Sequence, residues 1–426
     1  MLEVKRIRKN RDFVIKSLEK RGIKDVETKV DEVIKLDDDR KTLQTESDEI
    51  LSNINKASKK IGDLFKSGKG NEAESLKGEV ADLKQKVGFY EEKLKETEEA
   101  LEANLLEIPN VPHESVPAGV TEEDNEITED WNGPLPQLGD EAKPHWELIE
   151  KYDLVDFNLG VKIAGSGFPV YKGKGAVLQR ALIRYFLDEA TKAGCLEIIP
   201  PYLVNAATAR GTGQLPDKEG QMYHVTKDDL YLIPTAEVPV TNIFRGDIVN
   251  ADELPYKLTA YTPCFRREAG SYGADVKGLN RVHQFDKVEM VVIAKPEDSY
   301  NILDWMVEHV RNLLKNLGLP FRILRLCGGD LGFTSALTFD FEVYSAAQKK
   351  WLEVSSVSNF ETYQSNRMKI RYKNESGKSE LVHTLNGSVL ALARIVASLL
   401  ENNQTESGIE IPSVLKPYTG FERITL

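Results

Sequence analysis

Cysteine and long apolar runs are both scarce in this sequence of 426 residues. The three cysteines, Cys195, Cys264 and Cys327, are odd in number, widely spaced and without a Cys-x-x-Cys pair. This pattern argues against a disulfide framework and a cysteine-based zinc site, so we expect no zinc and a reducing, cytoplasmic setting. No run of about 18 apolar residues is present, and the charged N-terminal segment does not resemble a signal peptide, so we expect no membrane association.

An excess of basic charge is also missing, because the net charge is -12 at pH 7. Proteins that bind nucleic acids are usually basic on the binding face, so the total charge is mild evidence against that class. A local basic patch can nevertheless occur on an acidic protein. The length predicts two or three domains, since a single core rarely grows so large.

Residues 28–104 contain no proline and repeat apolar side chains every seven residues. The first half carries Leu36, Leu43, Ile50, Ala57 and Leu64, and the second half alternates steps of four and three from Leu76 to Leu101. This spacing places one apolar seam along each of two helices, and the glycines within residues 67–71 allow a turn. We predict two antiparallel helices that form a coiled-coil arm.

Lysines cluster near the predicted turn of this arm. Asp63 is the only acid between the ends of the cluster, which comprises Lys56, Lys59, Lys60, Lys66 and Lys69. A basic tip could contact phosphate groups without requiring a basic protein. An ordinary solvated coiled coil with chance lysines is the simpler interpretation of this segment alone.

Prolines separate the arm from the rest of the chain. Residues 109–145 contain six of them, so we predict a linker there, with a solvated acidic loop at residues 121–130. Beyond the linker, helical and strand-like patterns mix. An amphipathic helix over residues 175–192, closed by Gly194, precedes a predicted edge strand over residues 196–202 that meets Pro200 and Pro201.

Residues 261–293 combine two strand-like runs with a loop that contains Gly270, Gly273 and Gly278. Strand alternation predicts that residues 285, 287 and 289 share one face, and that Cys264, Arg266 and Glu268 share another. Fixed cations beside an aromatic face and a buried acid suit a ligand that is phosphorylated, aromatic and cationic, such as ATP together with an amino acid. A surface hairpin with salt-bridged charges is the alternative.

Three further segments carry candidate polar groups. Thr235 and Glu237 follow a proline break, where they could equally form a strand end and a helix cap. Glu353 and Ser356 offer hard oxygen ligands suited to Mg²⁺, or belong to an ordinary strand. In the last segment we expect residues 387 and 388 to open a helix, with Arg394 about two turns in or simply snorkelling at the core edge.

Together these segments resemble the class II aminoacyl-tRNA synthetases, in the form found in bacterial seryl-tRNA synthetases. Residues 175–202 resemble motif 1 with Pro201 as its proline, residues 261–293 resemble motif 2, and residues 385–394 resemble motif 3. The Thr-Ala-Glu segment and the arm indicate the serine type. The sequence departs from the pattern at Val389 and Ala393, where many relatives carry glycine.

The resemblance implies an α+β fold with an antiparallel two-helix coiled-coil arm and a catalytic domain on a mostly antiparallel β-sheet flanked by helices. It implies a tRNA-binding domain at residues 1–108, a linker at 109–145 and a catalytic domain at 146–426. It also implies a homodimer formed through motif 1.

The resemblance further assigns roles to individual residues. Arg266 and Arg394 would be catalytic, Glu353 and Ser356 would hold Mg²⁺, and the lysine cluster would bind tRNA. The serine ligands would be Thr235, Ala236, Glu237, Arg266, Glu289, Asn386 and Ser388. The ATP ligands would be Arg266, Arg267, Glu268, Val282, Phe285, Glu353, Val354, Ser355, Ser356 and Arg394.

The implied reaction joins serine to ATP as seryl-adenylate and then transfers serine to tRNA(Ser), and to tRNA(Sec) where that tRNA is present. The loop at residues 269–280 would meet the acceptor end of the tRNA. Two rival interpretations remain: an enzyme that passes its amino acid to a carrier protein, and a coiled-coil scaffold with an inactive synthetase-like body. The arm argues against the first rival, and the intact set of charged site residues argues against the second.

Overall fold

The computed structural model describes residues 1–139, 142–268 and 277–426. Contacts between residues divide the chain into two compact units. Met1–Glu19 with Ile23–Pro109 form the first, called the hairpin unit, and Lys20–Gly22 with Asn110–Leu426 form the second, called the sheet unit. In the described residues, none of the helices has the length and apolar content needed to cross a membrane.

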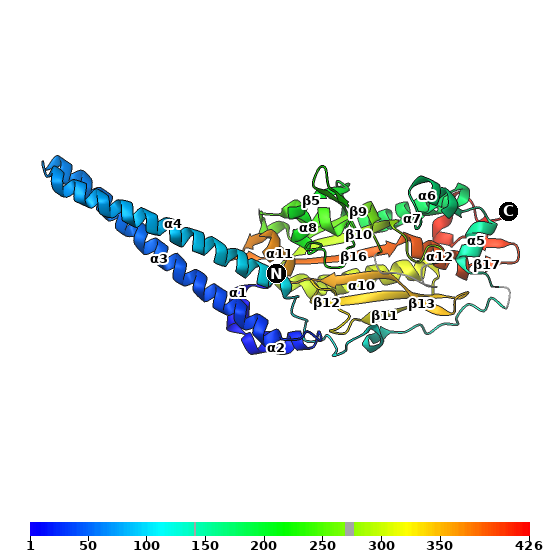
Figure 1. The fold of residues 1–426 in the computed structure, drawn as a ribbon. Coiled ribbons are helices and arrows are strands. Elements are labelled where there is room, and N and C mark those ends of the chain that lie inside the picture. Colours follow the sequence, from blue (N-terminus) through cyan, green and yellow to red (C-terminus); the bar gives the residue numbers. More distant parts are fainter. Residues whose placement is uncertain (140–141, 269–276) are drawn as a thin grey trace. The chain divides into compact units, whose positions relative to one another are not determined.

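The hairpin unit consists of α1 (Val4–Lys9), α2 (Arg11–Glu19), α3 (Val26–Lys66) and α4 (Gly70–Glu107). The two long helices lie alongside each other as an antiparallel pair (Figure 1), which confirms the predicted coiled-coil arm. Ile54, Val80 and Val87 are buried between them. The turn is shorter than predicted, because α4 already begins at Gly70 and Gly68 supplies the positive φ of 75° that the reversal requires.

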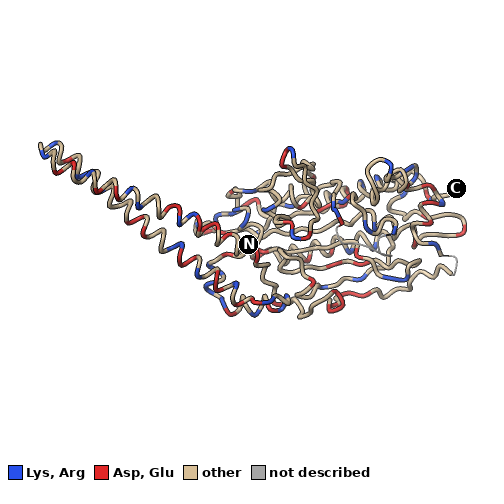
Figure 2. The backbone as a smooth tube through the Cα atoms, in the orientation of Figure 1, with Lys and Arg blue, Asp and Glu red and all other residues tan. Residues whose placement is uncertain are grey.

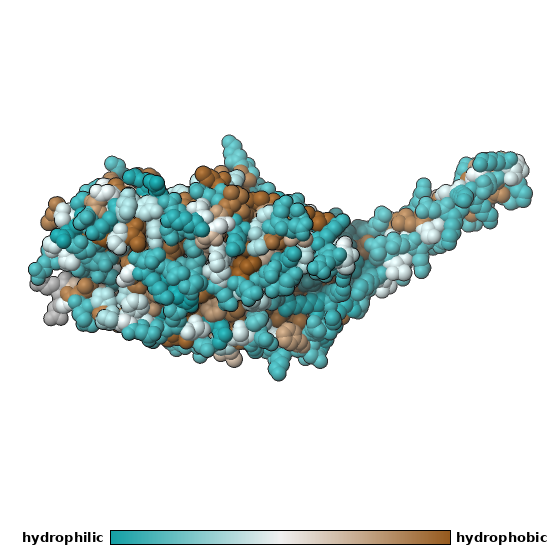
Figure 3. Space-filling model, turned by 180° about the vertical axis from the view of Figure 1, so that it is seen from behind, coloured by the Kyte–Doolittle hydropathy of each residue, from teal (hydrophilic) through white to brown (hydrophobic). Residues whose placement is uncertain are grey.

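Charged residues of both signs are spread along the two long helices (Figure 2), and the surface of the hairpin unit is mainly hydrophilic (Figure 3). One charged group in this unit is buried. The Asp37 side chain is only 6% exposed and accepts from Arg8 Nε at 2.7 Å and Arg40 Nη2 at 2.9 Å, with Lys41 Nζ at 2.6 Å. This cluster ties α1 to α3.

The sheet unit is built on an eight-stranded sheet with the order β1-β11-β12-β13-β16-β10-β9-β4. Every pairing in it is antiparallel except that of β4 with β9. In that order the strands are Glu126–Glu129, Phe321–Arg325, Leu337–Ser345, Lys350–Asn359, His383–Ala391, Gln284–Ala294, Tyr256–Phe265 and Leu196–Glu197. The predicted mostly antiparallel sheet is thus confirmed.

Three long helices share the main core with this sheet. They are α7 (Gly173–Lys192), α10 (Ser299–Leu317) and α12 (Leu392–Asn402). Met290 and Val292 of β10 belong to that core, together with Phe186 of α7, Val310 of α10 and Val396 of α12. Because side chains alternate along a strand, residues 285, 287 and 289 share the face of β10 opposite to Met290 and Val292, although Phe285 also packs against this core. That opposite face carries the pocket described below.

The acidic stretch at residues 121–130 is not the loop that we predicted. It contains a 3₁₀ turn, η1 (Glu122–Asp124), and the edge strand β1, which pairs with β11. Arg325 Nε donates to Glu126 Oε2 at 3.1 Å, and Arg311 Nε donates to Glu129 Oε2 at 2.8 Å. The acids are paired by arginines more than 180 residues away, which no local pattern could reveal.

Shorter elements complete the sheet unit. The motif 1 segment gives α7 as expected, but only Leu196 and Glu197 of the predicted strand adopt strand structure, as β4. The remaining helices are α5 (His145–Lys151), α6 (Phe157–Ile163), α8 (Ala206–Thr212), α9 (Glu237–Thr241), α11 (Tyr363–Met368) and α13 (Lys416–Thr419), with η2 (Asn242–Phe244), η3 (Ala251–Glu253), η5 (Pro296–Asp298) and η6 (Ser413–Leu415). The remaining strands are β2 (Val155–Asp156), β3 (Val170–Tyr171), β5 (Leu203–Asn205), β6 (His224–Val225), β7 (Leu230–Leu232), β8 (Ile248–Val249), β14 (Arg371–Lys373), β15 (Ser379–Leu381), β17 (Gln404–Thr405), β18 (Gly408–Glu410) and β19 (Arg423–Ile424).

Candidate active site

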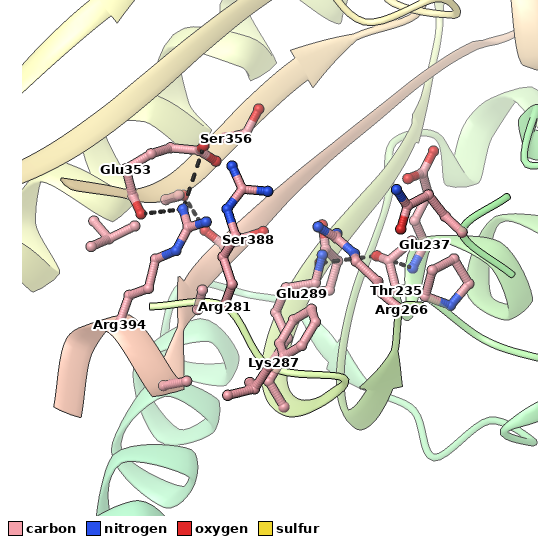
Figure 4. Close-up of a pocket in the computed structure, with 18 of the residues that line it drawn as sticks. Thr235, Glu237, Arg266, Arg281, Lys287, Glu289, Glu353, Ser356, Ser388 and Arg394 are labelled. Carbon is pink, nitrogen blue, oxygen red and sulfur yellow. Dashed lines mark hydrogen bonds and ion pairs between the residues drawn. The ribbon is translucent and has the colours of Figure 1, made fainter. Parts of the chain in front are cut away.

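A cavity of about 490 Å³ is lined by residues of β10, β13 and β16 and by the segment that follows β9. It collects polar side chains from segments that are far apart in the sequence. Its walls include most of the residues that the sequence indicated, namely Thr235, Glu237, Arg266, Glu268, Val282, Phe285, Glu289, Glu353, Val354, Ser355, Ser356, Asn386, Ser388 and Arg394. Glu353 and Arg394 lie at one end, and Thr235, Glu237 and Glu289 lie at the other (Figure 4).

An aromatic ring and two guanidinium groups mark the middle of the cavity. The Arg266 guanidinium carbon lies 5.2 Å from the centre of the Phe285 ring, within the range of a cation–π contact. Arg281 Nη1 lies 3.4 Å from Glu268 Oε2. A flat ring with cations close by is a surface on which a nucleobase can stack while its phosphates remain near positive charge.

The first strand of motif 2 ends earlier than the alternation pattern implied. β9 stops at Phe265, and Glu268 has a φ of +48°. Arg266 N still donates to His283 O at 3.0 Å, so the chain stays close to the second strand for one more residue. The prediction that Cys264, Arg266 and Glu268 share one strand face is therefore wrong, because Cys264 is fully buried while the two charged residues line the cavity through an irregular turn.

Two buried carboxylates stand at the other end of the cavity. Glu289 on β10 is 2% exposed, and its Oε2 accepts from Thr235 Oγ1 at 3.3 Å and pairs with Lys287 Nζ at 2.5 Å. Glu237 opens α9, and its Oε1 accepts from Gln364 Nε2 at 2.7 Å. This arrangement provides two acceptors for a small ligand that carries donors.

Burial and, to a smaller extent, the nearby negative charge of Glu289 together raise the pKa of Glu237 to about 7. The hydrogen bond from Gln364 and the positive charge of Lys287 act in the opposite direction. A carboxyl group in this balance is partly protonated near neutral pH and becomes fully ionised when a cation arrives. Such groups cluster at functional sites.

Asn386 and Ser388 line the cavity from β16, the strand next to β10 in the sheet. The strand register places Ser388 directly across from Glu289. Asn386 is 7% exposed, and its Nδ2 makes no hydrogen bond of normal length among the described residues, although its amide is close enough to Glu237 to lower the pKa of that carboxyl group. A buried amide donor without a partner costs free energy unless a ligand or water accepts from it.

The motif 3 segment differs from the prediction. Residues 387 and 388 do not open a helix, because β16 runs to Ala391 and α12 starts at Leu392. β16 is hydrogen-bonded to β10 on one side and β13 on the other, which extends the strand through these residues. Arg394 is therefore in the first turn of α12, where its Nη1 donates to Glu353 O at 2.6 Å and lies 3.5 Å from Glu353 Oε2.

Several residues predicted for the site lie outside the cavity, or their side chains already form hydrogen bonds within the protein. Ala236 is fully buried in a small apolar cluster, and Arg267 stacks over Tyr223 at 5.9 Å, so neither is part of the cavity lining. Ser355 lines the cavity, but its hydroxyl donates to Ser388 O at 2.6 Å. Val389, one of the departures from the motif, is buried in the core, whereas Ala393 lines the cavity. Residues 269–276 of the predicted loop lie outside the described residues.

Sequence reasoning missed Lys287, Asn280 and Arg281, all of which line the cavity. The signal for Lys287 was present, because alternation placed it on the same strand face as Phe285 and Glu289. Asn280 had no such signal, since it contributes its backbone oxygen, which accepts from Arg394 Nε at 3.1 Å. Backbone contacts of this kind depend on the fold and leave no trace in side-chain patterns.

A magnesium ion fits the phosphate end of the cavity only if a ligand supplies most of its coordination. Glu353 is half exposed, and Ser356 offers a second oxygen. Within the described ranges, no group of three or more His, Cys, Asp or Glu side chains could hold a metal ion. Mg²⁺ commonly binds one or two carboxylates together with phosphate oxygens and water, so this donor set is compatible with Mg²⁺ that arrives with ATP.

The lysine cluster of the arm lies on α3 and the following turn, and all five side chains are exposed. Lys69 Nζ is 3.1 Å from Glu72 Oε1, an exposed pair that a stronger anion could displace.

Two family models match the chain. The model of the seryl-tRNA synthetase N-terminal domain matches residues 1–112, and the model of the class II core domain of the G, H, P, S and T tRNA synthetases matches residues 222–403. The serine–tRNA ligase of Salinibacter ruber is 50% identical over 426 residues, covering 100% of this chain and 99% of the relative. That of Chlorobium phaeovibrioides is 45% identical over 428 residues, with the same coverage.

Solved structures agree with these matches. The crystal structure of seryl-tRNA synthetase from Pyrococcus horikoshii complexed with ATP has a TM-score of 0.91 and 34% identity, covering 100% of this chain and 99% of that one. The cytoplasmic serine–tRNA ligase of Naegleria fowleri in complex with AMP has a TM-score of 0.87 and 28% identity, with the same coverage.

Proposed function

The chain belongs to the seryl-tRNA synthetase family of the class II aminoacyl-tRNA synthetases, and from this membership we propose which residues ligate serine to tRNA with ATP. One observation carries the proposal. A single face of β10 presents Phe285, Lys287 and Glu289 in a row, with the Arg266 guanidinium over the ring at one end of it. The proposed adenine site and the proposed amino-acid site are therefore neighbours, with the Arg266 guanidinium between them.

In the first step, the serine carboxylate attacks the α-phosphorus of ATP, and pyrophosphate leaves. Both reactants are anions, so they repel each other unless the site supplies positive charge. Arg266 lies between the adenine and serine sites, where its planar guanidinium can bridge the carboxylate and the α-phosphate. Charge that develops on the phosphate oxygens is then stabilised by a group already in position, and no protein nucleophile is required.

ATP would stack its adenine on Phe285, with Glu268 accepting from the adenine amino group. Arg394 would bind the γ-phosphate, since its guanidinium lies at the Glu353 end of the cavity. Glu353 and Ser356 would hold the Mg²⁺ that accompanies ATP, and the ion would neutralise part of the phosphate charge. Arg394 would exchange its present contact with Glu353 for the nucleotide.

Serine would be recognised by its three polar groups. Glu237 and Thr235 would bind the ammonium, Arg266 the carboxylate, and Glu289 with Ser388 the hydroxyl. Asn386 supplies a buried amide donor beside them. Alanine lacks the hydroxyl and would leave buried acceptors without partners, so the site rejects it strongly.

In the second step, the terminal adenosine hydroxyl of tRNA(Ser) would attack the seryl-adenylate. Lys56, Lys59, Lys60, Lys66 and Lys69 would contact the phosphate backbone of the tRNA, which is the usual basis of shape-directed RNA binding. The same features would serve tRNA(Sec) in an organism that has it.

We also propose a homodimer that forms along β4. This edge strand and the residues after it expose apolar side chains, with Leu196 at 63%, Ile199 at 80% and Leu203 at 41% exposed. An apolar sheet edge is normally covered by a partner. The free cysteines and the use of ATP and tRNA fit a cytoplasmic enzyme.

The test is ATP–pyrophosphate exchange with each standard amino acid, followed by charging of tRNA. We expect serine-dependent exchange without tRNA, and serine transfer when tRNA(Ser) is added. Absence of serine-dependent exchange would refute the proposed site. Exchange without any tRNA charging would instead favour the rival in which a carrier protein accepts the amino acid.

A further inference from the structure

The serine side of the cavity contains a buried lysine that the mechanism above does not use. Lys287 lies on β10 between Phe285 and Glu289, and its side chain is 7% exposed. Its Nζ is 2.5 Å from Glu289 Oε2, and both residues line the cavity. A charged group is costly to bury, so a buried ion pair at the centre of a binding site calls for a reason beyond stability.

The ion pair makes the two oxygens of Glu289 different from each other. Oε2 contacts both Lys287 Nζ and Thr235 Oγ1. Both of these side-chain contacts fall on Oε2, and neither involves Oε1. The lysine therefore occupies one oxygen and leaves the other available to a ligand that can donate.

The ion pair also distinguishes Glu289 from Glu237. Glu237 accepts from the uncharged amide of Gln364, whereas Glu289 has its own cation. Serine brings only one ammonium group. If both carboxylates were without a cation, they would compete for that ammonium, and the amino acid could bind in two orientations.

We propose that Lys287 is a positioning residue that neutralises Glu289 and so directs the serine ammonium to Glu237 and the serine hydroxyl to Glu289. The proposal rests on the proposed function. Every charge in the filled site then has a partner: Lys287 with Glu289, the ammonium with Glu237, and Arg266 with the carboxylate. Lys287 acts through Glu289 and need not touch the reacting atoms.

Loss of Lys287 should change the pH dependence of serine binding. Charged and titratable groups face Glu289 from three elements, namely Lys287 on β10, Cys264 and Arg266 at the end of β9, and Glu237 on α9. The neighbours on β16, Asn386 and Ser388, are uncharged. Lys287 is a cation that favours the ionised form of Glu237. Without it, two buried carboxylates face each other, and serine binding requires a higher pH.

The test compares Lys287→Met with Lys287→Arg, and uses Lys172→Met as a matched control. Lys172 is also paired, with its Nζ 2.6 Å from Asp153 Oδ1, but it lies outside the cavity. Pyrophosphate exchange is measured with serine and with alanine between pH 6 and pH 8. Circular dichroism and thermal melting confirm that each variant is folded.

We expect Lys287→Met to lower kcat/KM for serine by about 100-fold, and that for alanine by less than about tenfold, because the hydroxyl loses its oriented acceptor. The ATP KM should change less than about threefold, and the pH midpoint for serine should rise. Lys287→Arg should restore most of the serine preference, and Lys172→Met should behave as wild type. A merely structural lysine would not move the serine-to-alanine ratio or the pH midpoint.

An active wild type with an unchanged serine-to-alanine ratio and pH midpoint in Lys287→Met would overturn this proposal alone. A wild type without serine-dependent exchange would overturn the proposed function itself. If Lys287→Met does not fold, the double variant Lys287→Met/Glu289→Gln is compared with Glu289→Gln alone, because an uncharged residue at position 289 needs no cation. We then expect the same serine-to-alanine ratio and pH midpoint in both variants, and a further loss of serine preference in the double variant would refute the role of Lys287.

Discussion

The serine KM of the wild-type enzyme should fall as the pH is raised through 7, because the proposed serine site requires an ionised Glu237. This carboxyl group is 9% exposed, and burial together with the charge of Glu289 raises its pKa to about 7. An acid with a raised pKa is neutral below that value and ionised above it. In the proposed site the serine ammonium binds the ionised form of Glu237, so protons compete with serine for this carboxylate.

The size of the effect follows from the pKa. Glu237 is ionised in about one-tenth of the molecules at pH 6 and in about half of them at pH 7. When only a fraction of the enzyme is competent to bind, the apparent dissociation constant rises in inverse proportion to that fraction. The serine KM at pH 6 should therefore be about five times its value at pH 7.

The assay is serine-dependent pyrophosphate exchange at saturating ATP and Mg²⁺. The ATP KM is measured separately at each pH, since ATP itself titrates in this range. Calorimetry of serine binding in two buffers of different ionisation enthalpy gives a second readout. Each serine bound near pH 7 should release close to half a proton, because half of the Glu237 carboxyl groups must ionise.

The isosteric variant Glu237→Gln is the control. It cannot ionise, so it should bind serine weakly and without the pH dependence. A serine KM that stays constant between pH 6 and pH 7 in the wild type would refute the reasoning. So would a Glu237→Gln variant that keeps the wild-type pH profile, because the titrating group would then lie elsewhere.

Three further predictions concern the hydroxyl site, the arm and the stability of the hairpin unit. Glu289→Ala should raise the serine KM by about tenfold or more and the ATP KM far less, since only serine loses an acceptor; equal effects in steady-state exchange would contradict its role. Replacing Lys56, Lys59 and Lys60 by Glu should raise the tRNA KM by about tenfold or more and leave exchange unaltered, whereas unchanged tRNA charging would remove the arm from tRNA binding. Asp37→Ala should destabilise α3 by about 2 kcal/mol at neutral pH, as measured by hydrogen exchange. Burial alone would raise the pKa of Asp37, but hydrogen bonds from Lys41, Arg40 and Arg8 outweigh this effect and lower the pKa to about 2. A carboxyl group whose pKa is lowered by folding stabilises the folded state above its unfolded pKa of about 3.8, and this contribution is lost as the pH falls toward 2. A stability difference between wild type and Asp37→Ala that does not change with pH would contradict this account.

The arm was predictable because its determinants are local. A seven-residue repeat places apolar side chains on one side of each helix, and an antiparallel neighbour is the simplest way to bury them. Ile54, Val80 and Val87 in the seam illustrate this. The predicted turn extended to residue 71, whereas α4 begins at Gly70, because a glycine fits the first turn of a helix as well as a loop.

The face of β10 was also predictable, since alternation alone puts residues 285, 287 and 289 on one side. The contacts of those residues were not. Glu237 meets Gln364, which is 127 residues away, and Ser388 lies opposite Glu289 only because of the register between β10 and β16. The helical start proposed at residues 387 and 388 was wrong for the same reason, because two neighbouring strands extend β16 through them.

By itself, the sequence determined which side chains share a helix seam or a strand face, because those periodicities arise from the backbone geometry of each segment. It also determined the chemical types available, including the guanidinium groups, the carboxylates and the tip lysines. Only the tertiary structure decided that Lys287 pairs with Glu289, that Gln364 holds Glu237 and that Arg394 reaches Glu353. Strand order and register bring distant segments together, and no local pattern encodes which faces will meet.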